Sequence, residues 1–493
     1  MSTLATKVPG GILAIDQGTT STRALLIRAG CSPTITHAIE HQQHYPKPGW
    51  VEHSAEELVT NIQICINKSP DVSAIGIDNQ GESCLAWDAH SKEAICPVIV
   101  WQDNRTINAI EDLKAQGHRD YVMEKTGLPL DPYFSASKLS WITEHVPAAK
   151  VLLKKGKLRL GTTDAFFLDR LTGNFVTDLT TASRTSLMDI HTGKWDEKLC
   201  QIFNVPIESL PRIVSTTGDF GVVKKSNGAQ IPIVTSVVDQ QASLYGHGCH
   251  QSGDAKITFG TGAFALSVTG SKLRQSPEQG LLPTVAWQRH GQPTIYALDG
   301  GVYCAGSAIN WGGSLGLFTS FDEINHFSSP PAIQRHLAFV PALSGLACPH
   351  WDRRATGLWI GLSLDTNPMD MMQSMLEGIA FRAAEVIAAM TELSTGGDEI
   401  SIDGGVSANP YFCQFLADTL NRTIVVQRFP ELTAIGTGRL VSSYLEETGH
   451  TGNEMSVSEG QDRMVYEPNQ GASQSELYIE TFTRAVERSK SWA

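Results

Sequence analysis

The stretch AIDQGTTSTRALLI, residues 14–27, joins two short apolar runs through a turn rich in hydroxyl groups. The run GILAIDQG predicts a buried strand, and RALLIRAG predicts its antiparallel partner, so the stretch is expected to form a β-hairpin. Later in the chain, DAKITFGTGAFALSVTG, residues 254–270, repeats the order of strand, glycine-rich turn and strand. The repeated hairpin indicates two related halves.

The segments between and after the hairpins predict a mixed α/β chain. AEELVTNIQICINK has the apolar spacing of an amphipathic helix, and VSAIGIDNQG predicts a strand. Met369–Leu393 predicts a long helix whose methionines pack in the core; TGGDE ends it, and the strand ISIDGG follows. We expect two domains, residues 1–247 and 248–493, divided at the glycine-rich stretch YGHGCHQSGD.

Length and composition support this organisation and exclude several functions. A chain of 493 residues exceeds one ordinary core, and 41% hydrophobic and 18% charged residues are typical of a globular protein. The net charge of −13 opposes binding to nucleic acid. No apolar run approaches the roughly 18 residues of a membrane span, and the N-terminus lacks a signal-peptide pattern. Nine scattered cysteines without a CxxC pair favour a reducing cytosol, so we expect a cytoplasmic protein without membrane partners.

The turn of the first hairpin carries groups that suit a phosphate. Its tight bend, hydroxyl side chains and cation are supplied by Gly18, Thr19, Thr20, Ser21 and Arg23. Asp16, at the strand end before the turn, is placed to hold a magnesium ion through water. A hydroxyl-rich hairpin tip can also be merely solvated, and the turn alone leaves that alternative open.

Two later glycine-rich segments extend the pattern. The turn Gly260-Thr261-Gly262 offers a second backbone cradle for phosphate. Gly404 and Gly405 follow a strand end, where a flat base can approach the backbone closely. These three segments together fit a bound nucleotide.

The order DQGTTSTRA, DQQASLYG, TFGTGAF and DGGVSAN resembles that of the FGGY family of carbohydrate kinases, and most nearly its glycerol kinase branch. The resemblance runs from Leu13 to beyond Gly436 and includes YPKPGWVEH, DPYFSASK, ASRTSLMDIHTGKWD and ELTAIG. It implies an α/β fold of two ribonuclease-H-like (actin-like ATPase) domains with a nucleotide and substrate cleft between them. The implied activity is transfer of the γ-phosphate of ATP to a primary hydroxyl of a small polyol, with Mg²⁺ as cofactor and glycerol as the first candidate.

The resemblance also assigns residues to the site. It implies that ATP is bound by Thr19, Thr20, Ser21, Arg23, Thr261, Gly306, Asn310, Gly405 and Asn409, where Asn310 replaces the family's usual glutamine. It implies that the polyol is bound by Glu82, Trp101, Tyr133, Asp239, Gln240 and Phe264. The metal ion is expected near Asp16 and Asp239.

Asp239 is the catalytic residue that the resemblance implies. A primary hydroxyl does not ionise at neutral pH, so a carboxylate that accepts its proton helps the oxygen attack the γ-phosphorus. An Asp before two glutamines can instead be a helix cap, which is the alternative that the residues alone leave open.

The chain departs from the family at two places. Gly81 stands where glycerol kinases carry an arginine, and loss of that charged donor weakens glycerol binding by about tenfold or more. We therefore keep two hypotheses: the pocket accepts a four-carbon polyol (erythritol, threitol) or a short ketose, or a basic residue from elsewhere replaces the arginine. Gln230 stands where regulated relatives carry the arginine that binds fructose 1,6-bisphosphate, so we expect no such inhibition.

Two further expectations concern the protein's role and assembly. A non-catalytic nucleotide-binding regulator of the same fold is the main rival from another class. ADP release that depends on an added polyol distinguishes the kinase from this rival. We also expect a homo-oligomer, either a dimer or a tetramer.

Overall fold

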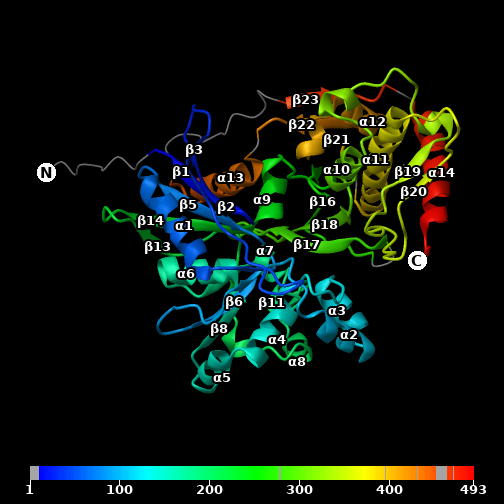
Figure 1. Cartoon of the computed structure of the whole chain (residues 1–493). Coiled ribbons are helices and arrows are strands. Elements are labelled where there is room, and N and C mark those ends of the chain that lie inside the picture. Colours follow the sequence, from blue (N-terminus) through cyan, green and yellow to red (C-terminus); the bar gives the residue numbers. More distant parts are fainter. Residues whose placement is uncertain are drawn as a thin grey trace. The chain divides into compact units, whose positions relative to one another are not determined.

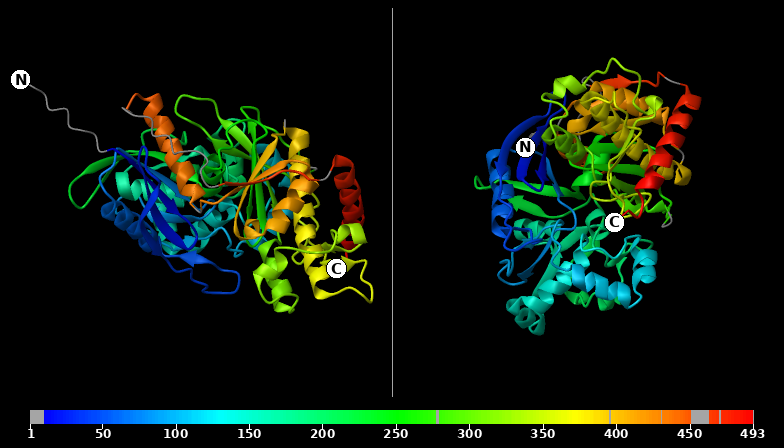
Figure 2. Two further views of the ribbon diagram at one scale, coloured as in Figure 1. Left: turned by 90° about the horizontal axis from the view of Figure 1, so that it is seen from above. Right: turned by 45° about the vertical axis from the view of Figure 1, so that its right-hand side comes forward.

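The computed structural model of the protein describes residues 10–276, 279–394, 396–429, 431–450, 463–469 and 471–492. Contacts divide the chain into two compact units (Figures 1 and 2), which are described separately. The first contains the residues up to Gly248, Thr284–Tyr296 and the segment that begins at Glu431. The second contains Cys249–Pro283, Ala297–Pro430 and the C-terminal segment. Two segments from the C-terminal half of the sequence therefore complete the first unit.

The central sheet of the first unit has the strand order β13-β14-β5-β1-β2-β3. β1 and β2 form the first predicted hairpin, in which Asp16 is paired with Arg23. β2 is antiparallel to β3, whereas β5 is parallel to both β1 and β14. The strands are β1 (Ile12–Gln17), β2 (Ser21–Ile27), β3 (Thr34–Glu40), β5 (Ala74–Asn79), β13 (Val222–Lys224) and β14 (Gln230–Val238).

A second sheet, most of whose strands belong to the second unit, repeats this plan in the order β17-β18-β16-β15-β21-β22-β23. β15 and β16 form the second predicted hairpin, and β21 is parallel to both β15 and β22. The strands are β15 (Ala255–Phe259), β16 (Ala263–Gly270), β17 (Leu282–Trp287), β18 (Ile295–Val302), β21 (Glu399–Asp403), β22 (Thr423–Gln427) and β23 (Arg463–Tyr466). Both hairpins and the internal repeat are thus confirmed, as is the fold of two ribonuclease-H-like units.

Helices cover both faces of the first unit's sheet, and β5 shows why. Ile75 and Ile77 enter the core that includes α1 and α6. On the other face, a Cβ atom on Gly76 would lie 2.7 Å from Val441 of α13, so only glycine lets that helix approach so closely. Figure 2 shows α13 (orange) beside the blue strands. The helices of this unit are α1 (Ala55–Lys68), α2 (Ile107–Ala115), α3 (Arg119–Thr126), α4 (Ser135–His145), α5 (Pro147–Lys154), α6 (Thr163–Thr172), α7 (Leu179–Ala182), α8 (Glu197–Ile202), α9 (Asp239–Gly246) and α13 (Leu432–Glu447).

A smaller four-stranded sheet in the same unit has the order β4-β7-β6-β8 and a core of its own. Two residues expected in the polyol site lie at its ends, because Glu82 precedes β6 and Trp101 follows β7; a third, Tyr133, precedes helix α4. The remaining strands are β4 (Glu52–His53), β6 (Cys84–Asp88), β7 (Val98–Ile99), β8 (Leu158–Thr162), β9 (Val176–Asp178), β10 (Met188–Asp189), β11 (Lys194–Trp195) and β12 (Arg212–Val214).

The long helix predicted in the second unit is α11, which begins at Pro368, one residue before its expected start. Asn367 caps it through a capping box. Met372, Met375 and Met390 are buried, so the prediction that the helix's methionines pack in the core holds for these three. The helices and remaining strands of this unit are α10 (Gly306–Ser314), α11 (Pro368–Leu393), α12 (Pro410–Leu420), α14 (Ala472–Ser489), β19 (Ala338–Val340) and β20 (Leu358–Ile360).

The cysteines and the helices bear on two further expectations. All nine cysteines fall within the described ranges, and each is a free thiol. In those same ranges, none of the helices combines the length and the apolar character that crossing a membrane requires.

Candidate functional site

The turn of the first hairpin is held from both sides. The backbone N–H of Gly18 donates to the carbonyl of Ser21 at 3.0 Å, which closes the turn. The backbone N–H of His41 donates to the carbonyl of Thr20 at 3.0 Å. The ring Nε2 of His41 lies 3.0 Å from the carbonyl oxygen of Thr19. Thr20 is exposed, whereas Thr19 and Ser21 are half-buried. The three hydroxyl residues are therefore displayed on a fixed backbone at the strand ends.

Arg23, the cation expected at phosphate, is paired within the first unit. Its Nη1 lies 3.0 Å from both carboxylate oxygens of Glu431, the residue before α13. The Arg23 side chain is 40% exposed and that of Glu431 is 8% exposed. A phosphate at the turn would therefore share this guanidinium with Glu431.

Asp16 is part of an acidic pair that sequence reasoning missed. Asp16 and Asp78 are register partners at the ends of β1 and β5 and point to the same face of the sheet. Thr437 of α13 donates its hydroxyl to Oδ2 of Asp78 at 2.6 Å. Burial raises the pKa of Asp16, and burial together with the charge of Asp16 raises the pKa of Asp78 well above its ordinary value.

This pair suits a cation that arrives with a nucleotide. Mg²⁺ prefers carboxylate oxygens and usually takes one or two of them, together with phosphates and water. Two adjoining buried carboxyls do not ionise together easily unless a cation compensates them. The charge of Asp239 also raises the pKa of Asp78, so Asp239 is within electrostatic reach. Over the described residues, no group of three or more His, Cys, Asp or Glu side chains is arranged to hold a metal ion by itself.

Glu82 is the buried carboxylate of the expected polyol site. Nε of Arg184 donates to its Oε1 at 2.6 Å, and its backbone carbonyl accepts the hydroxyl of Ser135 at 2.9 Å. Glu82 has a φ of 60°, a left-handed conformation that is uncommon outside glycine. Such strained backbone persists where the surroundings fix it, and it is common at functional sites.

Two aromatic residues connect the surroundings of Glu82 with the turn of the first hairpin. The rings of Trp101 and Tyr133 are 5.6 Å apart at 65°. The indole Nε1 of Trp101 lies 3.4 Å from Oγ1 of Thr19. The guanidinium carbon of Arg184 lies 5.9 Å from the centre of the Tyr133 ring. The structure therefore brings Glu82, Trp101 and Tyr133, three of the residues expected at the polyol, together beside the first hairpin.

Asp239 and Gln240 begin helix α9. Asp239 is half-buried, and its Oδ1 accepts the backbone N–H of Gln240 at 2.7 Å. Val238 occupies the position before the helix, so Asp239 is its first residue and not its cap. The helix-cap interpretation of Asp239 is therefore wrong.

The second unit carries a matching turn. The carbonyl of Thr261 accepts the backbone N–H groups of Ala305 and Ser307 at 2.9 and 3.0 Å. A Cβ atom on Gly306 would lie 2.6 Å from the carbonyl oxygen of Gly260, so the contact requires glycine. The second hairpin thus packs tightly against the start of α10.

The other residues expected at adenosine lie in the same unit. Some of them have open space around them, whereas others are already hydrogen-bonded within the protein. Asn310 is exposed on α10, and a Cβ atom on Gly405 would meet nothing within 4 Å. Asn409 caps α12: its amide oxygen accepts the N–H of Phe412 and its amide nitrogen donates to the carbonyl of Ile324, each at 2.8 Å. Both ends of the Asn409 side chain are therefore used within the protein. Phe264 is 44% exposed on β16.

Asp78 and Arg184 are the residues that sequence reasoning did not assign. The segment GIDNQG around Asp78 repeats the pattern of LAIDQG around Asp16, an apolar run followed by Asp and an amide. That likeness could have indicated a second acid at a neighbouring strand end. Arg184 had no such signal, because its partner Glu82 is 102 residues away.

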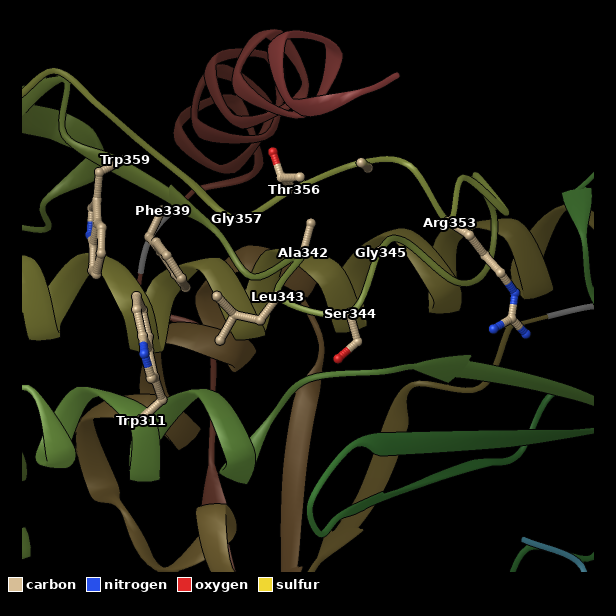
Figure 3. A pocket seen from close by; sticks show the side chains of 11 residues that line it. Trp311, Phe339, Ala342, Leu343, Ser344, Gly345, Arg353, Thr356, Gly357 and Trp359 are labelled. Carbon is tan, nitrogen blue, oxygen red and sulfur yellow. The ribbon is translucent and has the colours of Figure 1, made fainter. Parts of the chain in front are cut away.

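The second unit also contains a cavity of about 530 Å³ (Figure 3). Trp311, Phe339 and Trp359 gather at one end and Arg353 lies at the other. The rings of Trp311 and Trp359 are stacked at 5.5 Å. None of the residues expected at the nucleotide or the polyol lines this cavity.

Comparisons with known proteins cover nearly the whole chain. Residues 11–246 match the N-terminal domain of the FGGY family of carbohydrate kinases, and residues 255–440 match its C-terminal domain. Glycerol kinase 1 of Pseudomonas aeruginosa is 40% identical over 86% of this chain and 88% of its own length. Glycerol kinase of Alkalilimnicola ehrlichii is 38% identical over 98% of this chain and 99% of its own. The crystal structure of Plasmodium falciparum glycerol kinase with ADP has a TM-score of 0.87 and 30% identity over 97% of this chain and 98% of its own.

Proposed function

Because this chain belongs to the FGGY family of carbohydrate kinases, we propose that it transfers the γ-phosphate of ATP to a primary hydroxyl of a small polyol, glycerol being the first candidate. The observation that carries the proposal is the group formed by Glu82, Trp101 and Tyr133 beside the phosphate turn. A carboxylate and two aromatic rings suit a polyol. The carboxylate accepts hydrogen bonds from the hydroxyl groups, and the rings pack on the carbon chain.

Asp239 is the proposed general base. A half-buried carboxylate at the first residue of a helix can accept the proton of the attacking hydroxyl while that oxygen forms its bond to the γ-phosphorus. The bond between the γ-phosphorus and the β,γ-bridging oxygen breaks, and ADP leaves. Gln240 is exposed beside Asp239 and can orient a second hydroxyl.

The phosphates are proposed to lie on the two hairpin turns. Thr19, Thr20 and Ser21 supply hydroxyl and backbone N–H donors in the first unit, together with Arg23. In the second unit, Thr261 would contact phosphate, and Gly306, Asn310, Gly405 and Asn409 would contact adenosine. Asp16 and Asp239 would hold Mg²⁺, which neutralises phosphate charge when bound.

A coupled assay of ADP release tests this function. We expect ADP release from MgATP to rise with glycerol and to require Asp239. The panel should include erythritol, threitol and short ketoses, because Gly81 replaces the family's arginine. ADP release that no acceptor in the panel increases would contradict the kinase assignment and favour the nucleotide-binding regulator.

We also propose that the protein acts in the cytoplasm as a homo-oligomer, either a dimer or a tetramer. Free thiols in all nine cysteines fit a reducing compartment. Light scattering on the purified protein tests the assembly, and a monomer at micromolar concentration would contradict it.

A further inference from the structure

Position 81 is where this chain departs from the family, and its surroundings are filled. Gly81 is buried in a tight turn, in which the N–H of Ser83 donates to the carbonyl of Gly81 at 2.7 Å. A Cβ atom on Gly81 would lie 3.0 Å from Cγ1 and 3.6 Å from Cγ2 of Val238. The first distance is shorter than an ordinary contact between carbon atoms. The isopropyl group of Val238 therefore already crowds the space that the first carbon of a side chain at position 81 would enter.

Val238 is itself fixed in place. Its side chain is 3% exposed, and its backbone N–H donates to the hydroxyl of Thr180 at 3.0 Å. It directly precedes Asp239, the proposed base. A side chain at position 81 that displaced Val238 would therefore also move Asp239.

A cationic side chain, that of Arg184, lies near this position. Arg184 reaches Glu82 from the turn after α7, and its side chain is 7% exposed. Arg184 lies in the string ASRTSLMDIHTGKWD, one of the strings that carry the resemblance to the family. The departure at position 81 thus removes one hydrogen-bond donor, while Glu82 keeps its cationic partner.

We propose that Gly81 and Val238 form a size-complementary pair that keeps the acceptor site small, so that the acceptor is a three-carbon polyol and not a four-carbon polyol or a ketose. The inference rests on the proposed kinase function and deepens it. Loss of the arginine weakens the hold on one hydroxyl but does not enlarge the site. Removing the methyl groups of Val238 should then create the room that the change at position 81 by itself does not.

Acceptor selectivity tests the proposal directly. We expect kcat/KM of the unaltered protein for glycerol to exceed that for erythritol and threitol by about tenfold or more, and Val238→Ala to lower this ratio about tenfold. Val237→Ala is the matched control: it removes the same methyl groups from the neighbouring buried residue, whose side chain points to the other face of β14. The control should leave the ratio unchanged. A preference of the unaltered protein for four-carbon acceptors, or an unchanged ratio in Val238→Ala, would overturn the proposal.

A packing measurement separates this inference from the kinase function. Gly81→Ala should lower the melting temperature in the unaltered protein but have a smaller effect in the Val238→Ala background, because the contact at 3.0 Å is then absent. Equal effects in both backgrounds would show that the two residues are not a pair. If the two changes are coupled but no acceptor is phosphorylated, the pair stands as a packing feature. The kinase function, and with it the three-carbon assignment, would then be wrong.

Discussion

The guanidinium of Arg184 donates from Nε to Oε1 of Glu82 over 2.6 Å, and the two side chains are only 7% and 6% exposed. The pair joins the turn after α7 to the loop before β6. Desolvating both ions costs free energy, and removing one of them leaves the other buried without its partner. The arrangement therefore fixes the carboxylate that is proposed to receive the acceptor hydroxyls.

Arg184→Met should raise KM for the acceptor by about tenfold to a hundredfold, since a hydrogen bond to a charged group contributes about 1.5–3 kcal/mol. The change in kcat should be smaller, and Arg184→Lys should restore part of the affinity. Steady-state kinetics measures both parameters, and thermal melting checks that the variants fold. A double-mutant cycle with Glu82→Gln should give a strong coupling; independent effects would mean that Arg184 does not act through Glu82.

Asp239→Asn should lower kcat by about a hundredfold or more, because the amide cannot accept the hydroxyl proton. ATP binding, followed by calorimetry, should change little. Asp219→Asn, at an exposed aspartate of the same unit, is the control and should keep its activity. Turnover that survives in Asp239→Asn would remove Asp239 from its proposed role.

Asp16→Asn should raise the Mg²⁺ concentration needed for half-maximal ADP release, because one carboxylate of the proposed metal site is lost. Asp78→Asn should have a smaller effect, since an amide at position 78 can still accept the hydroxyl of Thr437. Titration of activity with Mg²⁺ at fixed ATP compares the two variants. Equal Mg²⁺ dependence in Asp16→Asn and the unaltered protein would contradict the metal assignment.

Stability should fall as the pH drops from 6.5 towards 4 because of His53. Burial lowers the pKa of this ring from 6.5 to about 4. Between these values only the unfolded chain binds the proton, so the free energy of unfolding decreases, by on the order of 1–3 kcal/mol. His53→Gln should flatten the dependence of the melting temperature on pH in this window. His90→Gln, the same change at an exposed histidine, is the control and should leave the slope of melting temperature against pH as it was. If His53→Gln does not alter this slope, His53 is not its source.

Fructose 1,6-bisphosphate should not inhibit the enzyme. Gln230, the first residue of β14, is exposed and stands at the position of the family's arginine. Lys225, the nearby buried cation, is paired with Asp71 at 2.8 Å. Activity measured with increasing bisphosphate should stay constant, and a saturable decrease would show that another cation replaces the missing arginine.

Local sequence patterns predicted much of the fold. The alternation of apolar runs and polar turns placed both hairpins, and the spacing of apolar residues placed α1 at the observed Ala55–Lys68. The positions of Thr19 and Asp16 could be predicted for the same reason, because both residues lie in the first hairpin itself. The helix-cap alternative for Asp239 was left open because capping is decided by backbone angles, and these place Val238 in the cap position.

Side-chain pairs between distant segments could not be predicted from the sequence. Arg23 with Glu431, and Asp78 with Thr437, each join strands near the N-terminus to residues at or near α13, more than 350 residues later. No local pattern gives the distance between such residues, because that distance depends on how the helix packs on the sheet.

The sequence by itself determined that this protein has two related α/β halves with a glycine-containing polar turn in each, because hydrogen-bonded hairpins and apolar periodicity are local properties of the chain. Only the tertiary structure decided that Val238 fills the space beside Gly81 and that Arg184 faces Glu82. Which side chain fills a space or neutralises a charge depends on which residues are neighbours in the folded structure. Such neighbours can lie far apart in the sequence.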